Sequence, residues 1–374
     1  MAVIVQKYGG SSVADVEKIR RVAARVAGTR AQGKQVVVVV SAMGDTTDEL
    51  LALARKISPD PHRRELDMLL TAGERISMAL LGMALHDRGV EAVSFTGSQS
   101  GIITDGAHTN ARILEVRPVR ILEELGRGRV VIVAGYQGVS REKEITTLGR
   151  GGSDTTAVAL AAALEAEVCE ICSDVDGVYT ADPRIVSGAR RLAELSHEEM
   201  QELALAGAKV LNAQAVEFAR DSGITIHARS TFESGPGTKV ARSAARELRI
   251  SGVALDAEIL MVRNAPLEVL AKHGAWPREA WGAQCIVSLE NVHALPALLD
   301  DLREAEVETD LAQVAVVGTG IGASKESLDR ALRALGLSPR LVLVAPLRLA
   351  FLVPREAAKD CLRRLHAEFV EKES

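Results

Sequence analysis

The sequence predicts an α/β protein whose N-terminal domain has three layers (α/β/α), with helices on both faces of a mostly parallel central sheet, followed by an α+β region. Three observations support this prediction. Gln35–Ser41 is an almost unbroken valine run, as expected of a central parallel strand covered on both faces. Strand-like runs and helical patterns alternate as far as residue 172. At 374 residues the chain exceeds one ordinary hydrophobic core, so two domains are expected.

The first domain opens with a strand at Val3–Gln6, a glycine turn, and a helix at Val13–Arg30, where apolar residues recur at helical spacing. The further helices are expected over Glu49–Ile57, Arg64–Asp87, Arg117–Leu125, Ala157–Ala166 and His197–Ala206. The further strands are expected over Val90–Phe95, Arg129–Ala134, Val168–Cys172 and Thr225–Ala228. Such alternation favours parallel strands joined by crossover helices.

A glycine-rich stretch, Ile145–Ala157, is the main candidate for ligand binding. Its glycines allow positive φ and close approach of a ligand, and residue types that cap helices follow them: Gly149, Gly151 and Gly152, then Ser153, Asp154 and Thr155. Because free N–H groups at a helix N-terminus attract phosphate or carboxylate, we expect an anion site. A turn that only reverses the chain is the alternative. Arg150 favours the anion, since a fixed cation in a glycine loop loses solvation unless it has a partner.

Lys7 stands at the carboxyl end of the first strand, where open α/β sheets bind their ligands. The glycine turn beside it offers backbone amides that can hold a phosphate. This turn matches neither the Walker pattern nor the dinucleotide fingerprint. Taken alone, Lys7 is more simply explained as a surface lysine near a turn.

Two acidic positions leave alternatives open. Glu74, inside the helix expected over Arg64–Asp87, is either an exposed helix charge or an inward carboxylate that awaits an ammonium group. The acidic turn Asp174–Asp176 looks like a calcium loop, but the glutamate expected at loop position twelve is missing. A nucleotide edge is better supported there, with Tyr179 for contact and Arg184 as a phosphate cation.

The composition excludes several classes of protein. A net charge of −5 and 3% aromatic residues argue against a nucleic-acid binder. No membrane span is expected, because Val36–Val40 is too short and Leu341–Val353 is interrupted by Pro346 and Arg348. A strand begins at Val3 and leaves no room for a signal peptide, so we expect a cytoplasmic location.

A C-x-x-C pattern, Cys169 and Cys172, suggests zinc or redox chemistry at first sight. The pair lies in an expected buried strand, where residues three apart face opposite sides and cannot easily grip one metal. We therefore interpret both as structural thiols and expect no metal site built from the protein's own side chains.

Six blocks together, in this order, resemble the aspartate kinases of the amino acid kinase superfamily over residues 1–240. They are Lys7–Ser12 (KYGGSS), Ser41–Leu50 (SAMGDTTDEL), Gly73–Arg75 (GER), Phe95–Arg112 (FTGSQSGIITDGAHTNAR), Thr146–Ala157 (TTLGRGGSDTTA) and Ser173–Arg184 (SDVDGVYTADPR). The resemblance implies transfer of the ATP γ-phosphoryl group to the side-chain carboxylate of L-aspartate, giving 4-phospho-L-aspartate, the entry step to lysine, threonine and methionine. A carboxylate with a pKa of about 3.9 is already ionised at neutral pH, so the reaction needs no general base. It needs the two reactants to be positioned and their charges to be neutralised.

The resemblance also implies residue roles. Lys7 would contact the transferring phosphoryl group and Asp154 would hold Lys7, with the amides of Gly9–Gly10 and Gly151–Gly152 completing a phosphate cradle. Arg150 would pair with the α-carboxylate of aspartate and Glu74 with its α-ammonium. The full implied substrate set is Thr47, Glu74, Arg150, Gly151, Gly152 and Ser153. The implied ATP set is Lys7, Tyr8, Gly9, Gly10, Ser11, Ser173, Asp174, Tyr179, Arg184 and Lys209. Mg²⁺ is expected to arrive with ATP, held mainly by phosphate oxygens.

The resemblance is weaker over residues 244–374, after an expected kinase domain at 1–243. Strands and helices alternate there in a pattern similar to the paired ACT domains, which are ferredoxin-like and regulate many aspartate kinases. We expect the first ACT unit to be truncated, because Asn264–Gly282 has too few residues for the usual helix and strand. The resulting hypothesis is a homodimer formed through this region, in which inhibition by lysine or threonine is lost or altered.

Three other functions fit the sequence less well. A kinase for another small acid, such as glutamate or acetylglutamate, is disfavoured because Glu74 and Arg150 together suit a free amino acid. A catalytically silent ATP-binding partner is disfavoured because Lys7, Arg150 and Asp154 are all kept. A dinucleotide-dependent oxidoreductase lacks its glycine fingerprint and ribose-binding acid.

Overall fold

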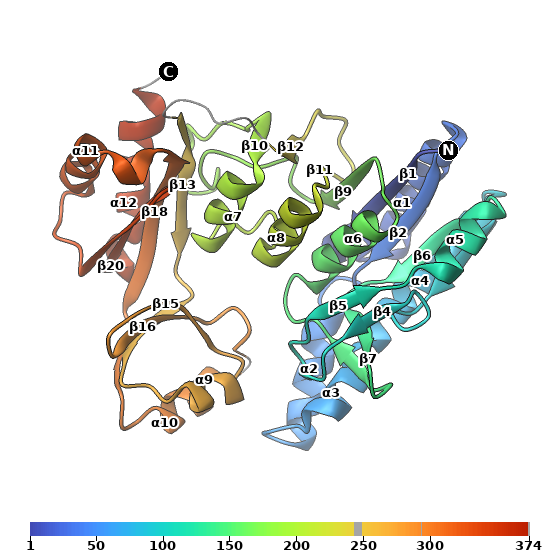
Figure 1. Ribbon diagram of the computed structural model, residues 1–374, viewed down its shortest axis with the longest axis horizontal. Helices are drawn as coiled ribbons and strands as arrows, with labels where there is room; N and C mark the ends of the chain where they lie inside the picture. The colour runs from blue at the N-terminus through green and yellow to red at the C-terminus, as the bar shows by residue number, and fades with distance from the viewer. Residues whose placement is uncertain (243–248, 293, 373–374) are drawn as a thin grey trace. The chain divides into compact units, whose positions relative to one another are not determined.

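The computed structural model describes residues 1–242, 249–292 and 294–372 and falls into two compact units (Figure 1). The first unit contains Met1–Val178, Ala193–His197 and Val210–Arg242. The second contains Tyr179–Leu192, Glu198–Lys209 and the described residues after 242. Two stretches of the expected kinase domain therefore group with the C-terminal region.

An eight-stranded sheet forms the middle of the first unit. Its order is β10 (Glu194–Ser196), β12 (Thr238–Ala241), β11 (Ile226–Ser230), β9 (Val168–Ser173), β1 (Val3–Tyr8), β2 (Gln35–Val40), β6 (Val130–Ala134) and β3 (Ala92–Phe95). Every neighbouring pair is parallel except β11 and β12. In β1, Lys7 lies level with Val39 of β2 and Ile171 of β9, so β1 is central, and the mostly parallel sheet is as expected.

Helices cover both faces of this sheet, which confirms the three-layer prediction. α1 (Val16–Ala31) and α4 (Ala72–His86) pack together on one face, over a core that includes Tyr8, Val38 and Ile132. α6 (Gly152–Ala163) and α8 (Ala213–Ser222) pack together, with α6 against β1, β2 and β9. Because successive strand residues face opposite sides, Lys7 points away from the Tyr8 core.

A second, four-stranded sheet was not expected from the sequence. Its order is β5 (Ile113–Val116), β4 (Ile102–Thr104), β7 (Gln137–Ser140) and β8 (Ile145–Thr147). Its strands are three or four residues long, too short for their alternation to be recognised beside the polar residues around them. β8 forms the first three residues of the glycine-rich stretch Ile145–Ala157, so this small sheet fixes where that stretch begins.

Several helix boundaries differ from those expected. α1 starts at Val16, because Gly10–Ser12 form a 3-10 turn and Asp15 caps the helix by accepting from the Lys18 amide at 2.8 Å. The helix expected over Arg64–Asp87 is two helices, α3 (Arg63–Leu70) and α4. The others in this unit are α2 (Thr46–Ile57) and α5 (Val119–Gly126).

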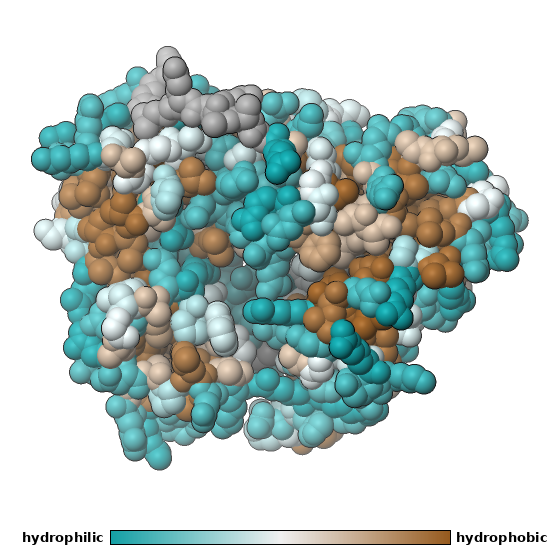
Figure 2. All heavy atoms as spheres, viewed as in Figure 1, coloured by the Kyte–Doolittle hydropathy of each residue, from teal (hydrophilic) through white to brown (hydrophobic). Residues whose placement is uncertain are grey.

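One helical stretch, Arg63–His86, is long and apolar enough to cross a membrane, so the expectation that no such segment exists was wrong. A core helix of a water-soluble protein meets the same criteria. Here Asp67 and Glu74 are buried along the stretch together with Leu70, Leu81 and Leu85. The surface agrees with this interpretation. Figure 2 shows polar side chains over most of one face of the molecule, with hydrophobic side chains in separate patches.

The second unit is α+β, as expected, and has two four-stranded sheets. One is β13 (Arg249–Asp256), β18 (Leu311–Thr319), β20 (Arg348–Pro354) and β19 (Leu341–Ala345); the other is β15 (Trp276–Trp281), β16 (Gln284–Ser288), β14 (Ile259–Arg263) and β17 (Glu306–Glu308). The helices are α7 (His197–Leu205), whose first residue belongs to the first unit, α9 (Leu267–Lys272), α10 (Leu295–Asp301), α11 (Lys325–Leu335) and α12 (Ala358–His366). A five-residue π-helical turn, Ala367–Glu371, follows α12.

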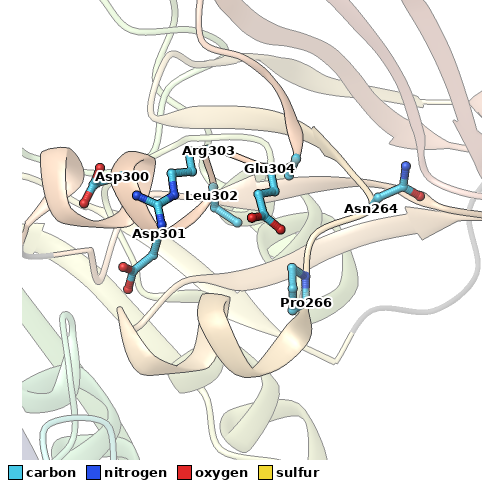
Figure 3. Close-up of a pocket in the computed structure, with 8 residues that line it drawn as sticks. Asn264, Pro266, Asp300, Asp301, Leu302, Arg303 and Glu304 are labelled. Carbon is cyan, nitrogen blue, oxygen red and sulfur yellow. The ribbon is translucent and has the colours of Figure 1, made fainter.

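The prediction that Asn264–Gly282 cannot hold both a helix and a strand was wrong. The six residues of α9 and the six of β15 both fit, because tight turns at Asn264 and Gly274, each with positive φ, use few residues. A polar cavity of about 350 Å³ lies in this unit, between Asn264 and Pro266 on one side and Asp300–Ala305 on the other (Figure 3). None of the site residues predicted from the sequence lines it.

Candidate active site

Lys7 and Asp154 meet in an ion pair, with Lys7 Nζ 2.6 Å from Asp154 Oδ1. The two side chains are only 13% and 10% exposed. Lys7 comes from the carboxyl end of β1 and Asp154 from the first turn of α6, where the helix dipole favours a carboxylate. A largely buried lysine therefore sits at a helix N-terminus with one carboxylate as partner, an arrangement that can receive a second anion.

The glycine loop before α6 has a geometry that only glycine permits. Gly149 and Gly151 have φ of 75° and 72°. A Cβ on Gly151 would lie 2.2 Å from Asn212 Nδ2, and one on Gly152 would lie 2.7 Å from Leu148 Cβ. Gly152 is thus required for close packing, not for positive φ as predicted.

The cap of α6 also differs from the prediction. Gly151 is the N-cap, and Ser153, Asp154 and Thr155 lie inside the helix, which begins at Gly152. Starting the helix earlier moves Asp154 into the first turn, where it reaches Lys7. Asp154, one of the predicted capping residues, therefore presents its side chain to Lys7 instead of closing the helix.

Only some of the backbone N–H groups predicted to bind phosphate are available as donors. The Gly9 N–H donates to the Cys172 carbonyl at 3.3 Å and the Gly152 N–H to the Gly149 carbonyl at 3.0 Å. Within the described residues, the amides of Gly10 and Gly151 donate to no backbone carbonyl. The predicted pairs therefore reduce to one donor each, Gly10 and Gly151.

Glu74 is the inward carboxylate of the two alternatives that the sequence left open. It is 2% exposed, and its Oε1 accepts from the Ala42 N–H at 3.1 Å. Its Oε2 is buried and has no hydrogen-bond partner among the described residues. Burial raises the pKa of Glu74 to about 7. A buried carboxylate with one unsatisfied oxygen suits a cationic ligand group.

The other predicted first-unit residues differ in what they can contact. Arg150 is exposed, Thr47 is half-buried in the first turn of α2, and Ser11 is exposed in the 3-10 turn. Ser153 is 7% exposed and faces the turn after β6, since a Cβ on Gly135 would lie 2.6 Å from Ser153 Oγ. Tyr8 was predicted to contact ATP, but its ring is fully buried under α1, so only its backbone can do so.

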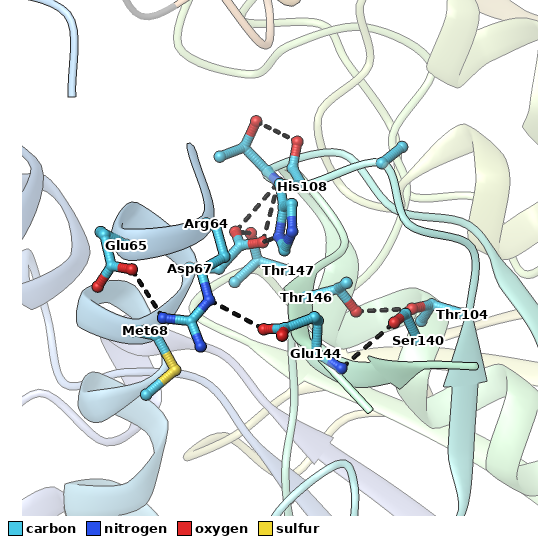
Figure 4. A network of polar contacts seen from close by, with 12 residues as sticks. Arg64, Glu65, Asp67, Met68, Thr104, His108, Ser140, Glu144, Thr146 and Thr147 are labelled. Atoms are coloured by element: carbon cyan, nitrogen blue, oxygen red, sulfur yellow. Dashed lines mark hydrogen bonds and ion pairs between the residues drawn. The ribbon is translucent and has the colours of Figure 1, made fainter. Parts of the chain in front are cut away.

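A buried polar network beside the glycine loop was missed by sequence reasoning (Figure 4). Asp67 is 0% exposed and accepts from Thr147 Oγ1 at 2.6 Å and from the Thr109 N–H at 3.0 Å, and it pairs with His108 Nδ1 at 2.6 Å. Burial raises the pKa of Asp67, and the hydrogen bonds oppose the rise. The network ties α3 to the loop 105–112 and to β8. Nothing in the sequence around Asp67 distinguishes it from an exposed charge on a helix surface.

Tyr136 is a second residue that was missed. It has a positive φ of 67°, and burial raises its pKa to about 12. Its ring packs at Gly152, because a Cβ on Gly152 would lie 3.0 Å from Tyr136 Cδ2. The one available signal was a bulky residue in the turn after β6, at a strand's carboxyl end.

The predicted nucleotide residues are divided between the units. Ser173 ends β9 and its Oγ accepts from the Val175 N–H at 3.3 Å, while Asp174 is exposed. In the second unit, the Arg184 guanidinium pairs with Asp182 at 2.7 Å and lowers the pKa of that carboxyl. Also in the second unit, Lys209 Nζ lies 3.0 Å from Glu258 Oε1. Both cations therefore have carboxylate partners that a phosphate would have to replace.

The four cysteines, Cys169, Cys172, Cys285 and Cys361, are buried and free. Burial raises the pKa of the Cys172 thiol to about 12 and that of Cys169 as well, which leaves both unreactive. Across the described residues, no group of three or more His, Cys, Asp or Glu side chains is arranged to hold a metal ion.

The sequence profile described as the amino acid kinase family matches residues 2–230, which covers most of the first unit. This match agrees with a three-layer fold in which a lysine on the central strand faces a glycine loop. Most of the first unit thus lies within the part of the chain that matches the amino acid kinase family.

Individual relatives are more specific. An aspartokinase of Mycolicibacterium smegmatis is 62% identical over 241 residues, which are 64% of this chain and 57% of that protein, so the match spans little more than half of the relative's length. The Corynebacterium glutamicum aspartokinase is 43% identical over 99% of this chain and 96% of its own. The crystal structure of Escherichia coli aspartokinase III in complex with aspartate and ADP has a TM-score of 0.84 at 25% identity, covering 98% of this chain and 99% of that one. This chain therefore belongs to the aspartate kinases of the amino acid kinase family.

Proposed function

We propose that the protein transfers the γ-phosphoryl group of ATP to the side-chain carboxylate of L-aspartate, giving 4-phospho-L-aspartate. The observation that carries this proposal is the pairing of two buried features in one unit: the Lys7–Asp154 ion pair beside the glycine loop, and the unsatisfied Oε2 of Glu74. The first suits a phosphoryl group and the second suits an α-ammonium. The relatives support the same acceptor, since the Escherichia coli enzyme was solved with aspartate and ADP.

The chemistry requires two anions to approach each other, so the main task of the protein is charge neutralisation. Lys7 is held by Asp154 so that its ammonium faces the transferring group without free rotation. The Gly10 and Gly151 amides add donors on either side. Because the acceptor carboxylate is already ionised at neutral pH, no side chain has to remove a proton.

Recognition of the acceptor falls to groups around the same loop. Glu74 accepts the α-ammonium through Oε2, and Arg150 pairs with the α-carboxylate, a geometry for which a guanidinium is well suited. Thr47 and Ser153 add hydrogen bonds. Tyr136, packed against Gly152, closes the apolar side of the acceptor position.

On the nucleotide side, Ser173, Asp174, Tyr179, Arg184 and Lys209 line ATP in this proposal. Mg²⁺ comes with ATP and rests mainly on phosphate oxygens. The product would enter lysine, threonine and methionine synthesis in the cytoplasm. A homodimer forms through the ACT-like region of the second unit.

The decisive experiment is trapping of the acyl phosphate with hydroxylamine in the presence of ATP and Mg²⁺. Aspartate and glutamate are compared as acceptors, and Lys7→Ala is assayed beside the wild type. We expect aspartyl hydroxamate from the wild type and a loss of more than about 10³-fold in the variant. Product from glutamate would instead support a kinase for another acid. No product from either acid would support the silent, ATP-binding partner.

Regulation is a separate proposal. α9 has six residues and follows a tight turn at Asn264, in the part of the ACT-like region expected to carry effector contacts. We propose that inhibition by lysine or threonine is lost or changed there. The rate of hydroxamate formation in millimolar lysine, threonine or both should stay within about twofold of the untreated rate. Strong inhibition by either amino acid would refute this proposal and leave the kinase assignment intact.

A further inference from the structure

Segment 179–192, within the second unit, is built onto the C-terminal helix α12 and the π turn that follows it. Ala181 and Val186 of the segment are 4% and 5% exposed and share one hydrophobic core with Leu362, Leu365 and Phe369. The segment has no helix or strand of its own beyond an isolated bridge between Tyr179 and Arg191. Its conformation therefore depends on what it packs against.

Polar contacts to α12 and to the π-helical turn after it reinforce this packing. Thr180 Oγ1 and His366 Nε2 lie 2.9 Å apart, and both residues are buried, at 6% and 0% exposed. Arg190 Nη2 donates to the Val370 carbonyl at 2.8 Å, and Arg363 Nε donates to the Ile185 carbonyl at 3.2 Å. The contacts are spread along the segment, so the helix holds it at several positions.

Thr180 is the centre of this arrangement because each of its polar groups is used. Its N–H donates to the Arg190 carbonyl at 2.9 Å and its carbonyl accepts from the Val253 N–H at 2.7 Å. Its Oγ1 accepts from the Arg190 N–H at 3.0 Å. One arrangement satisfies all of these groups. The Thr180 hydroxyl donates to His366 Nε2, and the His366 Nδ1–H donates to Glu371 Oε1 at 3.1 Å.

Tyr179 precedes Thr180 directly, and Arg184 follows it within the same segment. We propose that α12 and the turn Ala367–Glu371 position segment 179–192 for the nucleotide, with His366 and Thr180 as positioning residues. The C-terminal helix thereby contributes to ATP affinity without touching ATP. This inference rests on the proposed function, which gives Tyr179 and Arg184 their nucleotide contacts.

The test distinguishes the contribution of the hydrogen bond between Thr180 and His366 from that of their burial. His366→Leu and Thr180→Val remove the hydrogen bond and fill the same space with an apolar side chain of similar size. His366→Gln instead retains a hydrogen-bond donor and acceptor near the position of Nε2. In the full chain, KM for ATP and the Kd for Mg–ADP should rise about tenfold in the first two variants, with KM for aspartate within about twofold of wild type. His366→Gln should restore most of the loss. Unchanged nucleotide constants in folded His366→Leu and Thr180→Val would overturn the proposal, as would an equal rise in both KM values.

Two neighbouring exposed arginines give a matched pair that does not disturb the core. Arg363 contacts the segment through Ile185, whereas Arg364 pairs with Asp360 at 2.8 Å on its own helix. Arg363→Ala should raise the Kd for Mg–ADP about two- to threefold and Arg364→Ala should leave it unchanged. Equal effects of the two variants would refute the positioning role even if the buried variants fail to fold.

The same titrations distinguish the inference from the function on which it rests. Wild-type protein that binds Mg–ADP but forms no aspartyl hydroxamate would refute the aspartate kinase proposal, and the Kd comparison among variants would still decide the positioning role. Wild-type protein that forms hydroxamate while every variant keeps its Kd would refute only the inference. Absence of Mg–ADP binding by the wild type would refute both.

Discussion

The Lys7 region and segment 179–192 are held in their conformations by different means. Around Lys7, β1, α6 and the glycine loop between β8 and α6 fix the geometry, through a largely buried ion pair and close packing at Gly151 and Gly152 that leaves no room for a Cβ. Segment 179–192 relies on a helix far along the chain, through Thr180 and His366. From this difference we expect the Lys7 region to be intolerant of change and segment 179–192 to be adjustable from the C-terminal region.

The largest effect is expected at the ion pair of the Lys7 region. Asp154→Asn removes the charge that holds Lys7 but keeps the size of the side chain. We expect kcat for hydroxamate formation to fall by about 10²–10³-fold, because the lysine loses its fixed position and a buried cation loses its partner. Steady-state rates with saturating ATP and aspartate measure this.

The matched control is the more exposed pair of Lys34 with Glu167, which joins the loops that precede β2 and β9. Glu167→Gln should leave kcat unchanged, since exposed ion pairs contribute little. A similar fall in both variants would show that the effect is structural and general.

A smaller effect, on the free energy of unfolding, is expected when a methyl side chain is introduced into the glycine loop. Gly151→Ala places a methyl group 2.2 Å from Asn212 Nδ2 at a φ of 72°. Gly33→Ala has a similar φ of 80° but nothing within 4 Å. The unfolding free energy should fall by about 1 kcal/mol for Gly33→Ala and clearly more for Gly151→Ala, as judged from denaturant midpoints. Equal losses would mean that the contact with Asn212 has no role in the loop.

Glu74 gives the Lys7 region a pH dependence. Its pKa is raised in the folded protein to about 7, from 4.5, so the folded state holds this proton more tightly than the unfolded state. The resulting stability is complete below pH 4.5 and is lost as the pH rises to about 7, with an upper limit of about 3 kcal/mol. Glu74→Gln should lack this loss, so its stability should exceed that of the ligand-free wild type at pH 8.

The same ionisation should control acceptor binding. Because only the carboxylate form attracts the α-ammonium, KM for aspartate should decrease in the wild type as the pH rises from 6 to 8. In Glu74→Gln, KM for aspartate should be about tenfold higher and independent of pH in this range. A wild-type KM that does not vary with pH would contradict the assigned contact.

The smallest effect is expected at Arg184 in segment 179–192. This residue is exposed and already paired with Asp182, so a phosphate replaces an existing partner. Arg184→Ala should raise KM for ATP about threefold and leave KM for aspartate unchanged. An effect as large as that of Asp154→Asn would contradict the expectation that segment 179–192 is the more adjustable of the two regions.

These two regions also differ in how far the sequence predicts them. The valine run of β2 and the alternation around it predicted the parallel sheet, because burial on both faces leaves a local signal. Lys7 and Asp154 were paired through a family resemblance. Their contact depends on β1 and α6 being neighbours, which no spacing encodes.

Other features had no local signal. Asp67 lies in a helix, where its sequence context suggests an exposed charge, yet it is bound by two residues of the loop 105–112 and by Thr147 of β8. The commitment of the Gly9 amide to Cys172 follows from the pairing of β1 with β9, which only the fold reveals. The link between Thr180 and His366 joins segments separated by most of the second unit's sequence, so periodicity and motifs are silent about it.

The most direct test is a crystal structure with L-aspartate, Mg²⁺ and a non-hydrolysable ATP analogue. We predict the α-ammonium of aspartate within hydrogen-bond distance of Glu74 Oε2, its side-chain carboxylate in line with the terminal phosphate, and Lys7 Nζ on that phosphate. An aspartate bound elsewhere, or one whose α-ammonium leaves Glu74 Oε2 unpartnered, would contradict the account.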